Sequence, residues 1–183
     1  MLGKSLDVEE EYVMSKKIAT VLTNLFEDVE FTSPAEAFRE ANHEVVTIEK
    51  KAGNEVTGKQ GKTTVKIDKG IDDVTPEEFD ALFIPGGFSP DQLRADTRFV
   101  QFVDAFIKED KPIFAICHGP QLFIQTDRLK GRTVTGFTSI RKDLENAGAD
   151  VKDEEVVVDN NIVTSRTPDD LPAFNREALK LLQ

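Results

Sequence analysis

One short stretch of the sequence combines a nucleophile with a group that can carry protons. Cys117, the only cysteine among the 183 residues, follows the apolar run PIFAI and directly precedes His118 and Gly119. A buried strand that runs into a nucleophile, one further residue, a glycine and a helix is the pattern of a nucleophile elbow. The glycine allows the sharp turn, and the amino end of the helix favours the thiolate. The pattern predicts a reactive Cys117 whose pKa lies below its ordinary value.

A thiol enzyme also needs a group that moves protons and a site for an oxyanion. His43 lies between a predicted helix and a predicted strand, where a structural or solvent role is expected. His118 is therefore the histidine candidate for chemistry. Adjacent residues on a tight turn point in different directions, so an acid from elsewhere would have to orient it. Gly86 and Gly87 follow another strand and can turn backbone N–H groups toward an oxyanion. The alternative is that Cys117 is a core thiol and His118 a capping residue.

Three carboxylates, Glu27, Asp28 and Glu30, follow the first predicted strand. They would reach the same edge of the sheet as Cys117, because the carboxyl ends of parallel strands meet there. The alternative is a solvated loop that leads into a helix, where carboxylates are favoured at the amino end.

The elements that must position these residues alternate between strands and helices. Apolar and β-branched runs predict strands, and a 3.6-residue apolar period predicts helices, one of them with Ser33 as N-cap and Pro34 at its first position. Strands are expected over residues 17–23, 44–50, 77–87, 111–117, 132–137 and 155–166, and helices over 32–44, 97–110, 119–129, 139–148 and 168–182. This alternation predicts one α/β domain, with a mostly parallel central sheet that helices cover on both faces.

Residues 53–60, GNEVTGKQ, match the phosphate-binding pattern G-x-x-x-x-G-K but end in Gln60, where a P-loop has the Ser or Thr that holds magnesium. A P-loop also opens a helix, whereas residues 62–68 alternate like a strand. A β-hairpin over residues 55–68 is therefore the favoured interpretation. The sequence also lacks the G-x-G-x-x-G pattern of a dinucleotide site, so no cofactor is expected.

The composition argues against several classes of protein. The 34 acidic and 23 basic residues give a net charge of −11, which disfavours nucleic acid and anionic membranes as partners. No apolar run approaches the roughly 20 residues that span a bilayer. One cysteine and two histidines, without CxxC or HxxxH spacing, argue against a zinc site, and no metal is expected. A single cysteine cannot form an internal disulfide, which fits a reducing cytoplasm.

Residues 1–13 stand apart from this pattern. They lack the apolar core of a secretory signal and precede MSKK, which looks like a natural start at Met14. We expect an N-terminal extension or tag that takes no part in the fold, which leaves residues 14–183 as the domain. A short amphipathic helix docked on the domain is the alternative.

Taken together, these motifs resemble the PfpI family of the larger ThiJ/PfpI superfamily. The resemblance extends from Met14 to the C-terminus, and residues 1–13 match nothing in the family. AICHGPQ and IPGG are its most specific parts, and the motifs follow in family order: FEDVE, TGKQGK, FDALFIPGG, AICHGPQ, LKGR, NAGA, VVVDNN and TSRTPDDL. The resemblance implies a flavodoxin-like sandwich of the class I glutamine amidotransferase type.

The resemblance also implies roles for individual residues. Cys117 matches the family nucleophile, and His118 matches the histidine beside it. Glu30 matches a buried carboxylic acid that holds its proton and donates it to the cysteine sulfur. Gly87 and the backbone N–H of His118 match the oxyanion site. Asp91 matches an acid that reaches the site of a neighbouring subunit, where some members have Glu.

Three functions are compatible with this interpretation, because family members share the fold and not the substrate. The first is a stress-related enzyme with glyoxalase or deglycase chemistry, in which Cys117 adds to reactive carbonyls and Glu30 or His118 moves the proton. The second is an intracellular cysteine peptidase or amidohydrolase with a triad of Cys117, His118 and Asp91. The third is a redox sensor or chaperone without turnover, in which Cys117 is oxidised reversibly.

The expected partners depend on these hypotheses. The substrate is a small carbonyl compound or a peptide, and neither nucleic acid nor a membrane is expected. A homodimer is expected because a shared Asp91 requires at least two chains, and a hexamer is the alternative.

Overall fold

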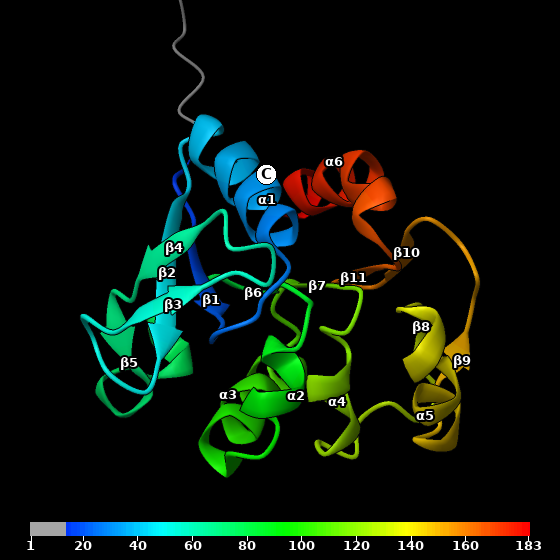
Figure 1. The fold of residues 1–183 in the computed structure, drawn as a ribbon. Coiled ribbons are helices and arrows are strands. Elements are labelled where there is room, and N and C mark those ends of the chain that lie inside the picture. The colour runs from blue at the N-terminus through cyan, green and yellow to red at the C-terminus, as the bar shows by residue number, and fades with distance from the viewer. Residues whose placement is uncertain (1–13) are drawn as a thin grey trace, which may run out of the picture.

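The computed structural model describes residues 14–183, and a seven-stranded sheet runs through their centre (Figure 1). The strands are β1 (Lys17–Val21), β2 (Glu44–Glu49), β5 (Lys69–Gly70), β6 (Ala81–Ile84), β7 (Ile113–Ile116), β10 (Val157–Asp159) and β11 (Ile162–Ser165). Their order across the sheet is β10-β11-β7-β6-β1-β2-β5. Neighbouring strands are parallel except β10 with β11. The predicted mostly parallel sheet is confirmed.

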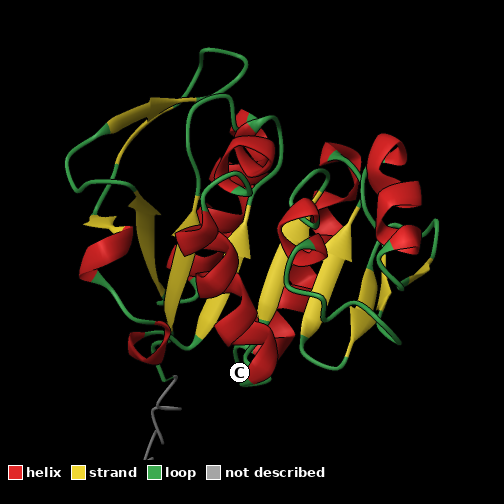
Figure 2. Ribbon diagram, turned by 90° about the horizontal axis from the view of Figure 1, so that it is seen from below, coloured by secondary structure: helices red, strands yellow, loops and turns green. Residues whose placement is uncertain are grey.

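Two small sheets and a set of helices complete the domain. The antiparallel pair is β3 (Glu55–Thr57) with β4 (Thr64–Lys66), and the parallel pair is β8 (Thr133–Val134) with β9 (Asp150–Val151). The α-helices are α1 (Asp28–Glu40), α2 (Ser89–Leu93), α3 (Thr97–Lys108), α4 (Gln121–Ile124), α5 (Arg141–Asn146) and α6 (Leu171–Leu181). Short 3-10 turns span Ile71–Asp73, Pro76–Glu78, Thr138–Ile140 and Pro168–Asp170. The helices lie on both faces of the central sheet (Figure 2).

The central strands are buried on both faces, because successive side chains point to opposite sides of a strand. Phe83 and Phe114 face α1 and α6, where their rings lie 5.6 and 5.7 Å from that of Phe38. On the opposite face, Leu82 and Ala115 pack in the core with α3 and α4. Figure 1 shows the same division, with α1 and α6 above the sheet and α2 to α5 below it.

The start of the first helix differs from the prediction. The helix begins at Asp28 instead of Ser33, and Pro34 lies inside it. Proline at that position removes only the hydrogen bond to the carbonyl of Glu30. The carboxylates of Asp28 and Glu30 are favoured in the first turn, and both side chains are buried by contacts with distant segments. Those tertiary contacts lengthen the helix beyond its local sequence signals.

The helix after Cys117 is also shorter than predicted. An α-helix over residues 119–129 was expected, but α4 spans only Gln121–Ile124. Residues 117–120 form turns, with a hydrogen bond from the Gly119 N–H to the Ile116 carbonyl of 2.8 Å.

The other predicted elements are present with shifted ends, except that residues 155–166, expected as one strand, form the antiparallel pair β10 and β11. The segment that resembles a P-loop forms the β3–β4 hairpin, as predicted. His43 accepts a hydrogen bond from the Lys16 N–H at 3.0 Å, which fits its predicted structural role. Gly148 has φ of 104° just after α5, where a helix favours glycine. The prediction about residues 1–13 lies outside the described residues.

Candidate active site

Three loops meet at the carboxyl edge of the sheet, after the adjacent strands β1, β6 and β7. The chain leaves β1 for β2 on one side and later returns to β6 on the other, and α/β proteins place their sites at such a reversal. The first two loops are joined by backbone hydrogen bonds, from Glu27 N–H to the Gly86 carbonyl at 3.2 Å and from Phe88 N–H to the Leu25 carbonyl at 2.8 Å. These hydrogen bonds hold the two loops side by side.

Cys117 sits on the third loop in a left-handed conformation, with φ of 62°. A non-glycine residue there carries a strain of about 1 kcal/mol or more, so the surrounding structure must hold it. Its N–H donates to the Ser165 carbonyl at 3.0 Å, and its carbonyl accepts from the Phe137 N–H at 2.8 Å. Gly119 is required two residues later, because a Cβ there would lie 2.7 Å from the Ile84 carbonyl oxygen.

Glu30 lies against Cys117 in the space that a side chain at Gly86 would occupy. A Cβ built on Gly86 would lie 2.4 Å from Glu30 Oε1 and 2.8 Å from Cys117 Cβ. Glu30 is fully buried, and neither carboxyl oxygen makes a hydrogen bond of good geometry within residues 14–183. Burial, and then the charge of Glu27, raise the pKa of Glu30 to about 8. At neutral pH most of the Glu30 population therefore carries a proton.

The Cys117 thiol is affected by the same burial. Its pKa is raised, first by burial and then by the negative charge that Glu30 can carry. The backbone N–H groups of Gly87 and His118 lie close to the sulfur and lower the pKa. The predicted low pKa is therefore wrong for the resting site: the thiol is only 7% exposed, and the four residues of α4 provide a weak dipole. Burial thus favours the protonated form of both the thiol and the acid.

The two predicted donors of the oxyanion site, the N–H groups of Gly87 and His118, are thus both directed at the nucleophile. Gly87 has φ of 79°, and a Cβ there would lie 2.4 Å from the Leu25 carbonyl oxygen. Only glycine fits this conformation and this space. Gly86 also makes room for Glu30 through its missing side chain, and its N–H lowers the pKa of that acid. Its predicted part in the oxyanion site stays a prediction.

The His118 ring is half-buried and lies beside Gln121 and Phe137. Its Nδ1 lies 3.0 Å from Gln121 Nε2, and its ring centre lies 4.8 Å from that of Phe137. Since Gln121 Nε2 can only donate, the neutral ring carries its proton on Nε2. Burial, followed by the charge of Lys59, lowers the pKa of His118. His118 therefore offers a neutral N–H donor rather than a base for Cys117.

Asp91 lies on α2 near the same site. The negative charge of Asp91 raises the pKa of His118, whereas burial and the charge of Lys59 lower it. No hydrogen bond joins the side chains of Asp91 and His118 within the described part of the chain. The predicted approach of Asp91 to the His118 of a neighbouring subunit stays a prediction.

Lys59 was missed by the sequence reasoning, which assigned residues 53–60 to a hairpin and a family motif and gave Lys59 no role in the site. Its ammonium group lies 4.0 Å from Glu27 Oε2 and 4.9 Å from the centre of the Phe88 ring. Its charge lowers the pKa of both Glu30 and His118. Lys59 is thus the cation that faces the site.

Asp28 explains why the hairpin reaches this position. Its buried carboxylate accepts hydrogen bonds from the N–H groups of Gln60, Lys62 and Thr63, at 2.7, 3.0 and 2.8 Å. A Cβ on Gly58 would lie 2.3 Å from this carboxyl group, so only glycine allows the approach. Burial raises the pKa of Asp28, but the three N–H donors outweigh it and lower the pKa overall. The sequence signal that could have placed the hairpin at the site was the presence of both an acid cluster after the first strand and the glycine-rich segment TGKQGK.

The described residues offer no set of side-chain ligands for a metal ion. Within residues 14–183, no group of three or more His, Cys, Asp or Glu side chains lies close enough together to hold a metal ion. In the same range, no helix is both long and apolar enough to cross a membrane.

A match to the DJ-1/PfpI family covers residues 16–181. The chain belongs to the DJ-1/PfpI family. General stress protein 18 of Bacillus subtilis is 65% identical over 93% of this chain and 99% of its own length. YraA, a Bacillus subtilis protein with a provisional cysteine-protease name, is 64% identical over 93% of this chain and 100% of its own length. Protein/nucleic acid deglycase 2 of Escherichia coli is 63% identical over 92% of this chain and 99% of its own length.

A solved structure supports the same conclusion about the fold. A two-domain protein of Anabaena variabilis, with DJ-1/ThiJ/PfpI-like and ferritin-like domains, superposes with a TM-score of 0.89 and 40% identity. The match covers 92% of this chain and 48% of that one. The resemblance to the PfpI family and the flavodoxin-like fold are confirmed.

The raised pKa of Glu30 predicts a pH dependence of stability. The folded chain holds this proton with a pKa of about 8, against an ordinary value of 4.5, so the stabilisation is complete below pH 4.5 and is lost as the pH rises through 8. In the uncharged variant Glu30→Gln this loss is absent. Between pH 4.5 and pH 8, we expect the free energy of unfolding of the wild type to fall by about 2–4 kcal/mol relative to that of the variant. Urea titrations of both proteins measure it, and parallel curves would contradict it.

The position of Lys59 predicts a change at His118. Because the charge of Lys59 lowers the pKa of His118, the variant Lys59→Met should raise it. An NMR titration of the two histidine rings measures the effect. His43 serves as the internal reference, since its pKa depends on burial and on Lys16. Unchanged titration of His118 would show that Lys59 does not face the site.

Proposed function

We propose that this DJ-1/PfpI protein is a stress-related cysteine enzyme that acts on reactive carbonyl compounds with glyoxalase or deglycase chemistry. The observation that carries the proposal is the fully buried Glu30 carboxyl, which lies beside Cys117 without a hydrogen-bond partner of good geometry in the described chain. Such an acid is costly unless a substrate or the nucleophile uses it. With a pKa of about 8, Glu30 can both give and take a proton near neutral pH.

The first step adds the thiol to the aldehyde carbon of a 2-oxoaldehyde. The sulfur–carbon bond forms while the carbonyl π bond breaks, and Glu30 gives its proton to the oxygen and receives that of Cys117. The product is a hemithioacetal, and the charge of the enzyme is unchanged. This exchange explains how a thiol with a raised pKa can react, since a free thiolate is never required.

The second step moves a hydrogen within the adduct. Glu30 first releases the proton it received to water, and its carboxylate then takes the proton from the former aldehyde carbon and returns it to the adjacent carbon. The hydroxyl proton of the adduct passes to the neighbouring carbonyl oxygen, so the first carbon is oxidised and the second is reduced. The resulting thioester is hydrolysed by water to a 2-hydroxy acid, and the Cys117 thiol is restored. The overall reaction adds one water and needs neither an oxidant nor a cofactor.

The remaining groups of the site stabilise charge on oxygen. The N–H groups of Gly87 and His118 can bind the oxygen that becomes negative in the addition and in the hydrolysis. In a deglycase reaction the substrate is the adduct of the carbonyl compound with an amine, which leaves when Cys117 adds. The name of the Escherichia coli relative, protein/nucleic acid deglycase 2, supports this variant, and the stress protein of Bacillus subtilis supports the setting.

We further propose a cytoplasmic location, on the strength of the single cysteine of the chain. The proposed assembly is a homodimer, with a hexamer as the alternative. A surface for it is offered by the side chains of Leu25, Val29 and Phe88, which are exposed near the site.

The proposal predicts the products of methylglyoxal. Wild-type protein should convert it to lactate, and Cys117→Ser should lose the activity by at least about a hundredfold. Glu30→Gln keeps the shape of the acid but cannot exchange protons, so its kcat should fall by about a hundredfold or more. Lactate is measured enzymatically, with an amine adduct of methylglyoxal as a second substrate. Production of lactate from neither substrate, with the thiol intact, would overturn the proposal.

A peptidase or amidohydrolase is the second candidate. It is favoured by the provisional protease name of YraA and by the position of Asp91, whose charge acts on His118. In this mechanism Asp91 orients His118 and stabilises its charged form, and His118 carries the proton to the leaving amine. Because Gln121 occupies Nδ1, the acid would have to bind at Nε2.

The second candidate predicts a selective effect of Asp91→Ala. Peptide hydrolysis should fall by about a hundredfold, since the histidine loses its acid, whereas conversion of methylglyoxal should stay within about twofold. Fluorogenic peptides and methylglyoxal are assayed in parallel on the same preparation. A variant that cleaves peptides as the wild type does would exclude this triad.

A further inference from the structure

The backbone of Cys117 is held from two sides by segments that are far apart in the sequence. Its N–H donates to the Ser165 carbonyl at the end of β11, and its carbonyl accepts from the Phe137 N–H after β8. The two segments are joined by a buried hydrogen bond of 2.9 Å from Thr135 N–H to Thr164 Oγ1. The conformation of the nucleophile therefore depends on how firmly these segments are fixed.

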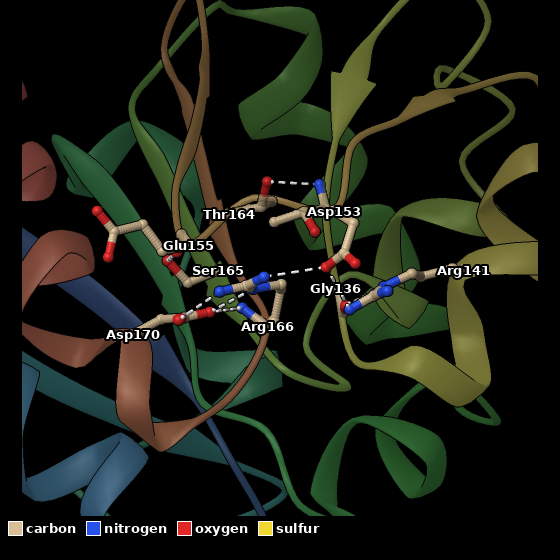
Figure 3. Close-up of polar contacts among 9 residues, drawn as sticks. Gly136, Arg141, Asp153, Glu155, Thr164, Ser165, Arg166 and Asp170 are labelled. Atoms are coloured by element: carbon tan, nitrogen blue, oxygen red, sulfur yellow. Dashed lines mark hydrogen bonds and ion pairs between the residues drawn. The ribbon is translucent and has the colours of Figure 1, made fainter.

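Arg166 fixes the first segment, directly after Ser165. Its guanidinium binds both carboxylate oxygens of Asp170, at 2.9 and 3.0 Å, and its backbone N–H binds the same carboxylate at 2.9 Å. Asp170 is almost fully buried. The remaining nitrogen, Nη1, binds Asp153 Oδ1 at 2.9 Å. Figure 3 shows Arg166 between the two carboxylates.

Arg141 fixes the second segment. Its Nε donates to the Gly136 carbonyl at 3.1 Å, and its Nη2 lies 3.1 Å from Asp153 Oδ1. Gly136 directly precedes Phe137, and a Cβ built on it would lie 3.3 Å from the Cys117 carbonyl oxygen. Asp153 is therefore shared by two arginines, one from each segment that holds Cys117 (Figure 3).

We propose that Asp153, Arg141 and Arg166 are positioning residues that hold Cys117 in its strained, reactive conformation. The contacts form a closed circuit, from the Cys117 carbonyl through Phe137, Gly136, Arg141, Asp153, Arg166 and Ser165 back to the Cys117 N–H. The φ of 62° at Cys117 needs such support. When Asp153 is removed, the segments lose the link between Arg141 and Arg166 and keep the buried bond between Thr135 and Thr164, so the fold stays while the hold on the Cys117 backbone loosens and its sulfur shifts relative to the N–H groups of Gly87 and His118.

The exposure of Asp153 separates this role from a simple role in stability. Its side chain is 67% exposed, so its ion pairs with the two arginines contribute little to the free energy of folding. A change at Asp153 should therefore leave the fold intact and still alter the reactivity of Cys117. The inference rests on the proposed function in one respect, since it takes Cys117 as the reactive group.

The test is the rate of alkylation of Cys117 by iodoacetamide over a range of pH, which is unambiguous because the chain has one cysteine. Asp153→Ala should lower the rate at neutral pH by about three- to tenfold and move the midpoint of the pH profile upward. Asp153→Glu, which keeps the carboxylate, should restore most of the rate. The matched control is Asp104→Ala, which removes a surface ion pair with Arg128 and should react like the wild type.

Arg141→Lys gives a second arm, because it keeps the charge but cannot bind Gly136 and Asp153 together. It should lower the rate in the same direction. The proposal is overturned if both Asp153→Ala and Arg141→Lys react like the wild type, or if Asp104→Ala slows the reaction equally. An unreactive Cys117 in the wild type would instead refute the proposed function, so the two failures are distinguishable.

Discussion

The contact between Glu30 and Cys117 is the constraint on which the rest of the site depends. Two acidic groups share a space from which water is largely excluded, so neither can carry a charge cheaply. The absence of a side chain at Gly86 makes the contact possible. The N–H groups of Gly87 and His118 supply the only nearby compensation among the contacts that lower the pKa of the thiol. Burial thus favours the protonated forms of both groups.

The fold delivers these groups from separate elements. Cys117 follows β7, Gly86 and Gly87 follow β6, and Glu30 lies in the first turn of the helix that follows β1. These strands are neighbours in the sheet, so their carboxyl ends bring the groups within reach of one another. The backbone bonds between the first two loops then fix the distance between the acid and the glycine pair.

Much of this arrangement was predictable because it depends on local sequence. The apolar strand before Cys117, the glycine pair at residues 86–87 and the alternation of strands and helices all follow from period and turn chemistry. The strand ends placed Glu27, Asp28 and Glu30 at the same edge as Cys117, and the family resemblance singled out Glu30 as the acid beside the sulfur. The start of α1 and the state of the Cys117 thiol were predicted wrongly, because both depend on burial by segments distant in the sequence. For the same reason Lys59 was missed: only the carboxylate of Asp28 shows where its hairpin lies.

The β3–β4 hairpin is a separate sheet whose strands bury Val56 and Val65 in the core, and Asp28 holds its loop through the backbone. Asp28 binds main-chain N–H groups, which every residue except proline provides, so the anchor does not depend on the loop's side chains. The side chain at position 59 can therefore change while the hydrogen bonds that place the loop remain. A change of the charge at this position leaves the loop and the groups around Cys117 in place, which is one physical route by which members of one fold come to differ in what they bind.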